Sequence, residues 1–380
     1  MDSKLLFSVD AYPGPDNFCD REEELDRLMA MWKQGRNGVL YSYRRMGKTG
    51  LIQHFHHHLN KKRKIVTVYL DVMDTSSDME FVQKIITSTL QALEHKKKGL
   101  LKNALTFFSQ LRPTISIDPI TQLPSIQLDT SKAAMVVPTL KALMNLLANQ
   151  PYEFQIAIDE FQQIANYKGN TVIDATLRSY FPTLKNVHFL FSGSERNLLL
   201  NLFSNPLKPL YASIEFMNLD YIDRKTYSAF IKRQFKKARK ASEDEAIEEI
   251  LRWTNGHTFY TQYLCSKILS TKKKLVTLNL VNQIKDQILY QYEVIYINYK
   301  KLLSKNQWKV LVAVAKEGTV SAYTAKAFLN KYNLSQSSTK QSIEALTKKS
   351  MLIEELTTDQ SIYKVYDVYL WRWAEKYGRV

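Results

Sequence analysis

At 380 residues the chain is long enough for two or three domains with sizeable hydrophobic cores. Hydrophobic residues make up 45% of it and charged residues 24%, as in an ordinary globular protein, and no apolar run approaches the ~20 residues that cross a bilayer. The two cysteines argue against a disulfide framework and for a reducing compartment. The first residues lack the basic, apolar and small-residue segments of a signal peptide. We therefore expect a cytoplasmic protein without a membrane span.

The net charge of +16 bears on the partners of the protein. Lysine and arginine gather in four clusters, at residues 61–64, 96–98, 233–240 and 272–274. Each cluster alone fits a solvated helix end or loop. Their sum favours a polyanionic partner, because a positive field concentrates nucleic acid or other phosphates.

Strands and helices are expected to alternate through the first half of the chain. A first helix should begin at Asp20, where Glu23 completes a capping-box pattern, and should end at Gly35. Short apolar runs predict five buried strands, at residues 39–41, 65–72, 154–158, 187–191 and 213–217. Periodicity predicts helices at about residues 49–59, 79–94, 100–112 and 138–148, and a short hairpin within 113–129. This alternation predicts an α/β fold, a parallel sheet with helices on both faces.

Helices replace strands after residue 219. Four are expected, at residues 224–240, 243–253, 258–269 and 280–297. A second group follows, with helices at about 307–315, 324–331 and 337–348 and short strands at 351–356 and 362–365. That succession is the outline of a winged helix-turn-helix. We therefore predict three domains: an α/β domain at 1–219, an all-α domain at 220–300 and a winged helix at 301–380.

The loop between the first strand and the next helix has the residues of a phosphate-binding loop. It reads SYRRMGKT, ending in Gly47, Lys48 and Thr49. In such a loop the backbone N–H groups face the phosphates, Lys48 reaches the β- and γ-phosphates and Thr49 ligates magnesium. We assign nucleotide contacts to Ser42, Arg44, Arg45, Met46, Gly47, Lys48, Thr49 and Gly50. Ser42 stands where the pattern has glycine, and its Cβ is expected to strain the turn by ~1 kcal/mol.

Two adjacent carboxylates, Asp159 and Glu160, follow the buried strand at 154–158. Because a Gly-Lys-Thr sequence alone is common by chance, this second element decides the interpretation. Burying paired acids is costly without a cation, and magnesium bound to a nucleotide supplies one. Asp159 would hold the ion through a water molecule, and Glu160 would polarise the water that attacks the γ-phosphate. The alternative is a strand that meets solvent at an Asp-Glu turn.

A third polar element, Ser192-Gly193-Ser194, follows the strand at 187–191. Polar strand ends of this kind sense the γ-phosphate in this class of protein, although a Ser-Gly pair is also an ordinary turn. The candidate catalytic residues are therefore Lys48, Asp159, Glu160, Ser192 and Ser194.

With these motifs the chain resembles the archaeal- and Bacteroides-type ATPases of the AAA+/STAND group, the ATPase domain 2 proteins. The similar segments are 18–25 (FCDREEEL), 44–49 (RRMGKT), 158–162 (IDEFQ), 191–194 (FSGS), 209–211 (PLY) and 255–257 (NGH). The resemblance covers about residues 15–380. It implies a P-loop ATPase domain with a five-stranded sheet, a helical lid and a C-terminal winged helix. It also implies that Phe18 and Arg21 lie near the adenine and that His257 contacts the nucleotide.

The resemblance implies ATP and Mg²⁺ as ligands, and hydrolysis that switches the lid and winged helix in a DNA-associated or signalling role. The alternative is a slow or non-hydrolysing nucleotide-binding regulator that works by assembly with a protein partner or with itself. Two departures bear on this choice. Thr258 replaces the proline of the family's lid signature, and Ala212-Ser213 replace the basic residue expected soon after PLY.

The function of the winged helix is open between DNA binding and protein docking. Residues 301–380 carry a net charge of +6, and the candidate recognition helix presents Ser337, Ser338, Thr339, Lys340, Gln341, Lys348 and Lys349. Against DNA binding, Glu354 and Glu355 on the next strand would repel a phosphate backbone.

Two other features receive no functional assignment. His54, His56, His57 and His58 are expected on a solvated helix face, since no carboxylate or thiolate cluster accompanies them as metal ligands. Arg178 and Arg196 are arginine-finger candidates that sequence alone does not place across an interface.

Overall fold

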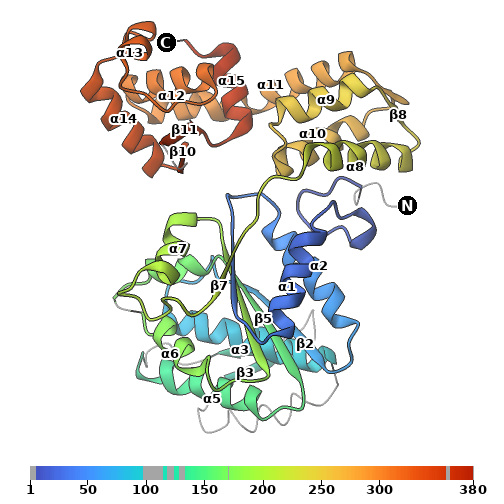
Figure 1. Ribbon diagram of the computed structural model, residues 1–380, viewed down its shortest axis with the longest axis vertical. Helices are drawn as coiled ribbons and strands as arrows, with labels where there is room; N and C mark the ends of the chain where they lie inside the picture. The colour runs from blue at the N-terminus through green and yellow to red at the C-terminus, as the bar shows by residue number, and fades with distance from the viewer. Residues whose placement is uncertain are drawn as a thin grey trace. The chain divides into compact units, whose positions relative to one another are not determined.

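The computed structural model describes residues 6–96, 114–117, 124–127, 133–169, 171–356 and 360–379. Contacts divide the chain into two compact units, one spanning Asp10–Tyr221 and the other combining Met1–Val9 with Ile222–Val380. No helix among these described residues is long and apolar enough to cross a membrane. Figure 1 colours the chain from blue to red along both units.

A five-stranded parallel sheet forms the centre of the first unit (Figure 1). Its spatial order is β2-β5-β6-β1-β7. The strands span Gly38–Tyr41 (β1), Ile65–Asp71 (β2), Glu153–Asp159 (β5), Val187–Gly193 (β6) and Glu215–Asn218 (β7). All five lie where the apolar runs predict them. Because the strands are parallel, the loops that follow β1, β5 and β6 meet at one edge of the sheet.

Helices cover both faces of this sheet, as predicted. The strand residues alternate between the faces: Leu40 and Ala157 pack with α1 and α2, whereas Val39 and Ile156 pack with the opposite helices. The first layer consists of α1 (Glu22–Lys33) and α2 (Lys48–Asn60). The second consists of α3 (Asp78–Lys96), α5 (Val136–Ala148), α6 (Ile173–Tyr180) and α7 (Arg196–Ser204).

The start of α1 differs from its prediction. The helix begins at Glu22, and its N-cap is Arg21, whose φ of 80° is left-handed and whose side chain makes no cap hydrogen bond. Asp20 also has a positive φ, of 57°, so the expected capping box does not form. The helix ends at Lys33, with Gly35 at φ 68°, close to the predicted stop.

A small antiparallel pair, β3 (Thr114–Ile117) and β4 (Pro124–Gln127), confirms the predicted hairpin strands. The helix expected at 100–112 lies outside the described residues. The sequence interpretation missed α6 and α7, which are short amphipathic helices of eight and nine residues.

The second unit contains a helical lid followed by a winged helix, as predicted. The lid comprises α8 (Arg224–Lys237), α9 (Asp244–Trp253), α10 (Thr258–Leu269) and α11 (Leu278–Leu302), with a two-residue parallel ladder of β8 (Ala241–Ser242) and β9 (Leu275–Val276). The winged helix comprises α12 (Lys305–Glu317), α13 (Lys326–Lys331), α14 (Gln336–Lys348), β10 (Leu352–Leu356) and β11 (Ser361–Val365). A final helix, α15 (Val368–Tyr377), was not predicted.

The N-terminal residues belong to this second unit. Phe7 is buried and packs against Phe235 and Phe230 of α8, with ring centroids 5.0 and 6.4 Å apart. The chain therefore passes between the units twice, after Val9 and after Tyr221.

Phe191→Ala should destabilise the first unit by about 3–5 kcal/mol, because it opens a cavity in the core. Phe191 is fully buried on β6, and its ring centroid lies 4.5 Å from that of Phe161 and 5.2 Å from that of Phe203. Urea unfolding checks this value. Leu207→Ala, at a side chain that is 91% exposed, is the control, and equal effects of the two substitutions would contradict the described core.

Candidate nucleotide-binding site

Two residues of the loop between β1 and α2 have a left-handed backbone conformation. Ser42 does not. Arg45 has a φ of 64°, and Gly47, the N-cap of α2, has a φ of 101°. The expected strain at Ser42 is therefore wrong, because a residue with a Cβ is accommodated there at negative φ. Gly47 supplies the strained turn that only glycine adopts freely.

Ser42 instead helps to anchor the loop lysine. The serine is buried, donates from Oγ to the Tyr43 carbonyl at 2.9 Å and accepts from Lys48 Nζ at 3.2 Å. Lys48 also donates to the Tyr43 carbonyl at 3.2 Å. Burial lowers the pKa of Lys48, and the nearby carboxylates of Asp159 and Glu160 oppose that shift. These contacts place a buried cation at the start of α2.

Asp159 accepts hydrogen bonds from β2, from β6, from the first turn of α2 and from the backbone N–H of the next residue. Its Oδ2 accepts from Thr49 Oγ1 at 2.6 Å and from the Tyr69 hydroxyl at 3.1 Å. Its Oδ1 accepts from Ser192 Oγ at 2.5 Å and from the Glu160 backbone N–H at 3.0 Å. The carboxylate is almost fully buried, and these donors offset the cost of burying its charge. The predicted acidic and sensor residues are thus brought together.

Glu160 is fixed by the same strand end. Its φ of 55° is left-handed, which turns the chain sharply after β5 into a 3-10 helix, Phe161–Asn166. Its Oε2 accepts from Ser194 N–H at 3.1 Å, Ser194 Oγ at 2.8 Å and Gln162 Nε2 at 2.5 Å. Ser192 therefore holds Asp159, and Ser194 holds Glu160.

Sequence reasoning missed two residues of this site, Tyr69 and Asp71 at the end of β2. Asp71 pairs in register with Asp159 on the neighbouring strand. Burial raises the pKa of Asp71, and the Asp159 and Glu160 carboxylates add to this shift. Burial and Asp159 likewise raise the pKa of Tyr69. Both residues lie at the C-terminal end of a strand that the sequence predicts, which was a usable signal. The sequence does not show that this strand lies next to β5, because that depends on the strand order.

Two segments of the chain match known protein families. Residues 18–264 match the model of an ATPase domain found predominantly in Archaea, and residues 294–376 match that of a probable winged helix domain. The chain belongs to this archaeal-type ATPase family. A search of curated proteins found no match.

Solved structures share the fold of this family member over nearly its whole length. The Walker-type ATPase PABY2304 of Pyrococcus abyssi is 19% identical, with a TM-score of 0.67 over 97% of this chain and 99% of that one. The ORC2 protein of Aeropyrum pernix, solved as ADPNP-ADP complexes, is 12% identical, with a TM-score of 0.57 over 98% and 96% of the chains. The ORC1 protein of Aeropyrum pernix, solved in complex with DNA, is 11% identical, with a TM-score of 0.53 over 99% and 96%. At these identities the likeness establishes the fold.

The ATPase-family site contains oxygen donors suited to magnesium. Thr49 Oγ1 and Asp159 Oδ2 lie 2.6 Å apart, and Asp71 ends the adjacent strand. Hydroxyl and carboxylate oxygens are the ligands that Mg²⁺ prefers. Among the described residues, no group of three or more His, Cys, Asp and Glu side chains is placed to hold a metal ion.

Phe18 and Arg21 are the residues implied for the adenine, and this role stays a prediction. Phe18 stacks on His54 of α2, with centroids 4.5 Å apart, and a Cβ on Gly50 would lie 3.2 Å from its ring. Gly50 thus permits an aromatic ring to cover the first turn of α2, beside the phosphate loop. The buried Arg21 donates to Glu24 Oε1 at 2.6 Å and to the Asp220 carbonyl at 2.5 Å. These bonds tie the start of α1 to the segment after β7.

The remaining predicted residues fall into three groups. Arg44 and Arg45 are exposed at the tip of the loop, whereas Met46 is buried beneath it. Arg196, at the start of α7, lies over the rings of Tyr41 and Tyr43, 5.1 and 5.8 Å from their centroids. His257 belongs to the second unit, where it is the buried N-cap of α10 and packs edge-on against Tyr260. Its nucleotide contact stays a prediction.

The expectation of a solvated histidine face is wrong for two of the four histidines. His54 is buried and shares a 2.6 Å hydrogen bond with the Tyr12 hydroxyl. Burial, with added repulsion from His58, His57 and Lys61, lowers its pKa to about 4. His56 is buried on the other side of α2, and burial lowers its pKa to about 3. Both residues are therefore core elements that are neutral at pH 7.

The stability of the first unit should fall as the pH decreases from about 7.5 to about 5. The unfolded chain protonates His54 and His56 near the ordinary histidine pKa of about 6.5, whereas the folded chain resists protonation until about pH 4 and 3. The unfolded state therefore gains protons first. Urea titrations at several pH values test this, with His56→Leu reducing the pH dependence and His95→Gln, at an exposed position, as the control. If the free energy of unfolding depended equally on pH in both variants, the role given to His56 would be contradicted.

Proposed function

We propose that this ATPase-family protein binds Mg·ATP at the β1–α2 loop and hydrolyses it with Glu160 as the base. The observation that carries the proposal is the contact between Thr49 and Asp159, which joins the phosphate loop to the acidic strand end at 2.6 Å. Bound magnesium would neutralise charge on the β- and γ-phosphates and would be held by these two residues. Lys48 would add a buried cation to the same phosphates.

Glu160 is suited to orient the attacking water. Its Oε2 accepts from Ser194 and Gln162, which orients the carboxylate, and its second oxygen would accept the proton of the water. Ser194 and Ser192 would couple the γ-phosphate to the acidic pair, because the same two residues hold Glu160 and Asp159. The sensor role proposed for both serines rests on these bonds.

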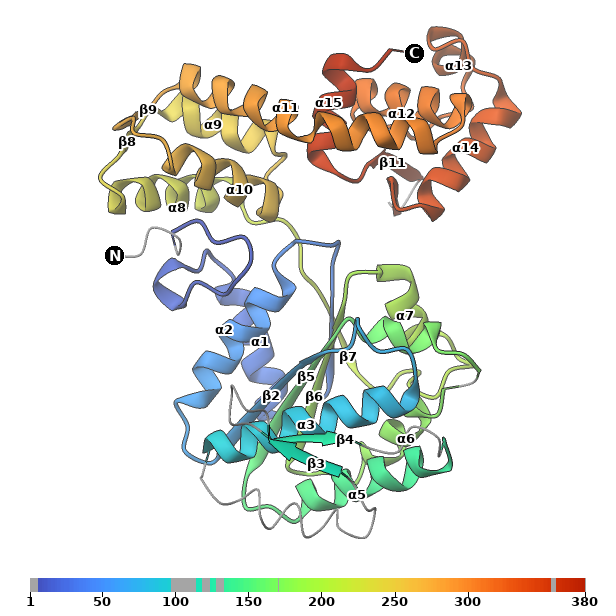
Figure 2. The ribbon, with the colours of Figure 1, turned by 180° about the vertical axis from the view of Figure 1, so that it is seen from behind.

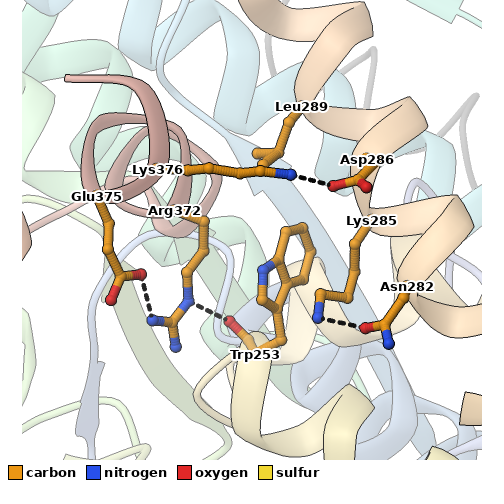
Figure 3. Close-up of a pocket in the computed structure, with 8 residues that line it drawn as sticks. All are labelled: Trp253, Asn282, Lys285, Asp286, Leu289, Arg372, Glu375 and Lys376. Atoms are coloured by element: carbon orange, nitrogen blue, oxygen red, sulfur yellow. Dashed lines mark hydrogen bonds and ion pairs between the residues drawn. The ribbon is translucent and has the colours of Figure 1, made fainter.

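The lid and winged helix would move together in a nucleotide-driven switch, because α15 is bound to the lid. Arg372 donates to the carbonyls of Trp253 at 2.9 Å and Arg252 at 3.1 Å, at the C-terminal end of α9 where a cation is favoured. Lys376 donates to Asp286 of α11 at 2.7 Å (Figure 3). Deeper in the junction the buried Tyr369 donates to the Tyr260 carbonyl at 2.9 Å.

Arg372 and Lys376 of α15 line a pocket of about 490 Å³ in the second unit (Figure 3). Its lining is Trp253, Asn282, Lys285, Asp286, Leu289, Arg372, Glu375 and Lys376. The charged groups neutralise one another: Arg372 pairs with Glu375, Lys376 with Asp286, and Lys285 with Glu249. Ion pairs around the pocket therefore help to hold α15 against the lid. The domain limits of 1–219, 220–300 and 301–380 stay a proposal, with the difference that residues 1–9 pack in the second unit.

Contact with DNA through the winged helix is a second part of the proposal. Lys340, Gln341 and Lys348 are exposed on α14, which supports it. Thr339 is fully buried and donates to the Ser335 carbonyl, so the expectation that it reaches DNA is wrong. Glu344 is exposed on the same helix and reduces its positive charge.

Glu160→Gln should leave ATP binding intact and reduce turnover by at least ~10²-fold, because it removes the base and keeps the shape. Asp159→Asn should weaken magnesium-dependent ATP binding. Steady-state hydrolysis and calorimetric titration of the purified protein measure both effects. Glu344→Gln, an exposed acid on α14, is the control. Wild-type turnover in both site variants would show that the acidic pair is structural, and wild-type turnover below one per hour would favour the slow regulator.

Lys48→Ala should weaken ATP binding by roughly 10–100-fold, because it removes a charge-assisted contact with the phosphates. Calorimetric titration with ATP and with ADP measures the loss. Lys64→Ala, an exposed lysine after α2, is the matched control. Unchanged affinity in Lys48→Ala would remove the phosphate-loop assignment.

A further inference from the structure

A second basic surface lies on the lid, formed by two segments far apart in the sequence. We define the lid tip as five exposed cations: Lys236, Arg239, Lys272, Lys273 and Lys274. The ladder of β8 and β9 joins the segments, pairing Ala241 with Leu275 and Ser242 with Val276. Figures 1 and 2 both show this ladder at the end of the lid away from the winged helix.

The two segments are held together by the backbone and by Lys240. The Ala241 N–H donates to the Lys274 carbonyl at 2.8 Å. Lys240 Nζ donates to the Thr271 carbonyl at 2.6 Å and to the Lys273 carbonyl. Lys240 thus serves the carbonyls that follow α10, where a cation is favoured. The three lysines after α10 are not needed for that role.

The charge of the lid tip is not balanced locally. Within the part of the chain that the structure describes, none of the five side chains forms an ion pair with a carboxylate. Of the three acids that follow β8, Asp244 pairs with Lys232 at 2.9 Å, Glu243 accepts from the Leu278 N–H, and Glu245 is exposed. Holding like charges side by side raises the energy of the folded state. A polyanion would relieve this repulsion.

We propose that the lid tip binds the phosphate backbone of duplex nucleic acid, independently of base sequence and of the winged helix. Lysine ammonium groups on flexible stems contact phosphates as point charges and carry no sequence information. A membrane surface fits less well, because it requires bulky apolar side chains beside the lysines. α8 buries Tyr227, Phe230 and Phe235, and among the residues that the structure describes Leu275, 45% exposed, is the large apolar side chain exposed next to the cluster in sequence.

This site goes beyond ATP hydrolysis and beyond the contact proposed for α14. The second unit would hold duplex at two places, with charge supplied by the lid and orientation by the winged helix. The lid and the winged helix belong to the same compact unit, so a movement of that unit would carry both contacts.

The test uses the full-length triple variant Lys272→Gln/Lys273→Gln/Lys274→Gln and a labelled duplex of mixed sequence. Binding is measured over a range of salt concentrations. Each lost phosphate contact should reduce the log–log slope by about 0.9, a total of about 2.7, and affinity at low salt should fall at least about tenfold. The control, Lys61→Gln/Arg63→Gln/Lys64→Gln, removes the same charge from exposed cations of the first unit, outside both proposed contacts, and should leave most of the affinity.

Wild-type duplex affinity and slope in the lid-tip variant would overturn the proposal. An equal loss in the control would also overturn it, since net charge alone would then explain binding. Vesicles containing phosphatidylserine form a third arm, and preferential wild-type binding to them would assign the surface to membranes instead. ATP turnover without DNA should be unchanged in both triple variants, so failure of this proposal is separate from failure of the hydrolytic one.

Discussion

The structure of the first unit depends on the burial of one carboxylate. Asp159 lies at the end of a strand that is buried on both sides, and a bare charge there would be unstable. Its hydrogen bonds recruit the phosphate loop through Thr49, β2 through Tyr69 and β6 through Ser192. The same hydrogen bonds that stabilise the buried carboxylate therefore also bring the residues of the nucleotide site together. The parallel sheet exists in the register that brings those three donors together.

The sequence was most informative where periodicity and motif agreed. All five strands of the sheet follow from short apolar runs, and the acidic pair follows from a strand that ends in two charges. Strand order did not follow, because periodicity describes one element at a time. Asp71 was missed for that reason: its partner lies 88 positions later in the chain, on a neighbouring strand. The hydrogen bonds of Ser192 to Asp159 and of Ser194 to Glu160 likewise could not be inferred without the three-dimensional structure.

Other differences arose where tertiary packing overrode a local pattern. Asp20 and Glu23 have the spacing of a capping box, but Arg21 is drawn into bonds with Glu24 and Asp220, and the helix begins after it. The histidines of α2 looked solvated because they are polar, yet Tyr12 and Phe18 fold over His54 and remove it from water. In both cases a distant segment supplied the interaction that decided the local structure.

The packing of Phe7 on α8 has a mechanical consequence. Because the first residues belong to the second unit, two covalent strands of the chain join the units, one after Val9 and one after Tyr221. Two covalent connections limit the separations that the units can reach more than a single one would, because each connection has a finite length. The packing of Phe7 on α8 therefore makes the amino-terminal segment a second tether between the units.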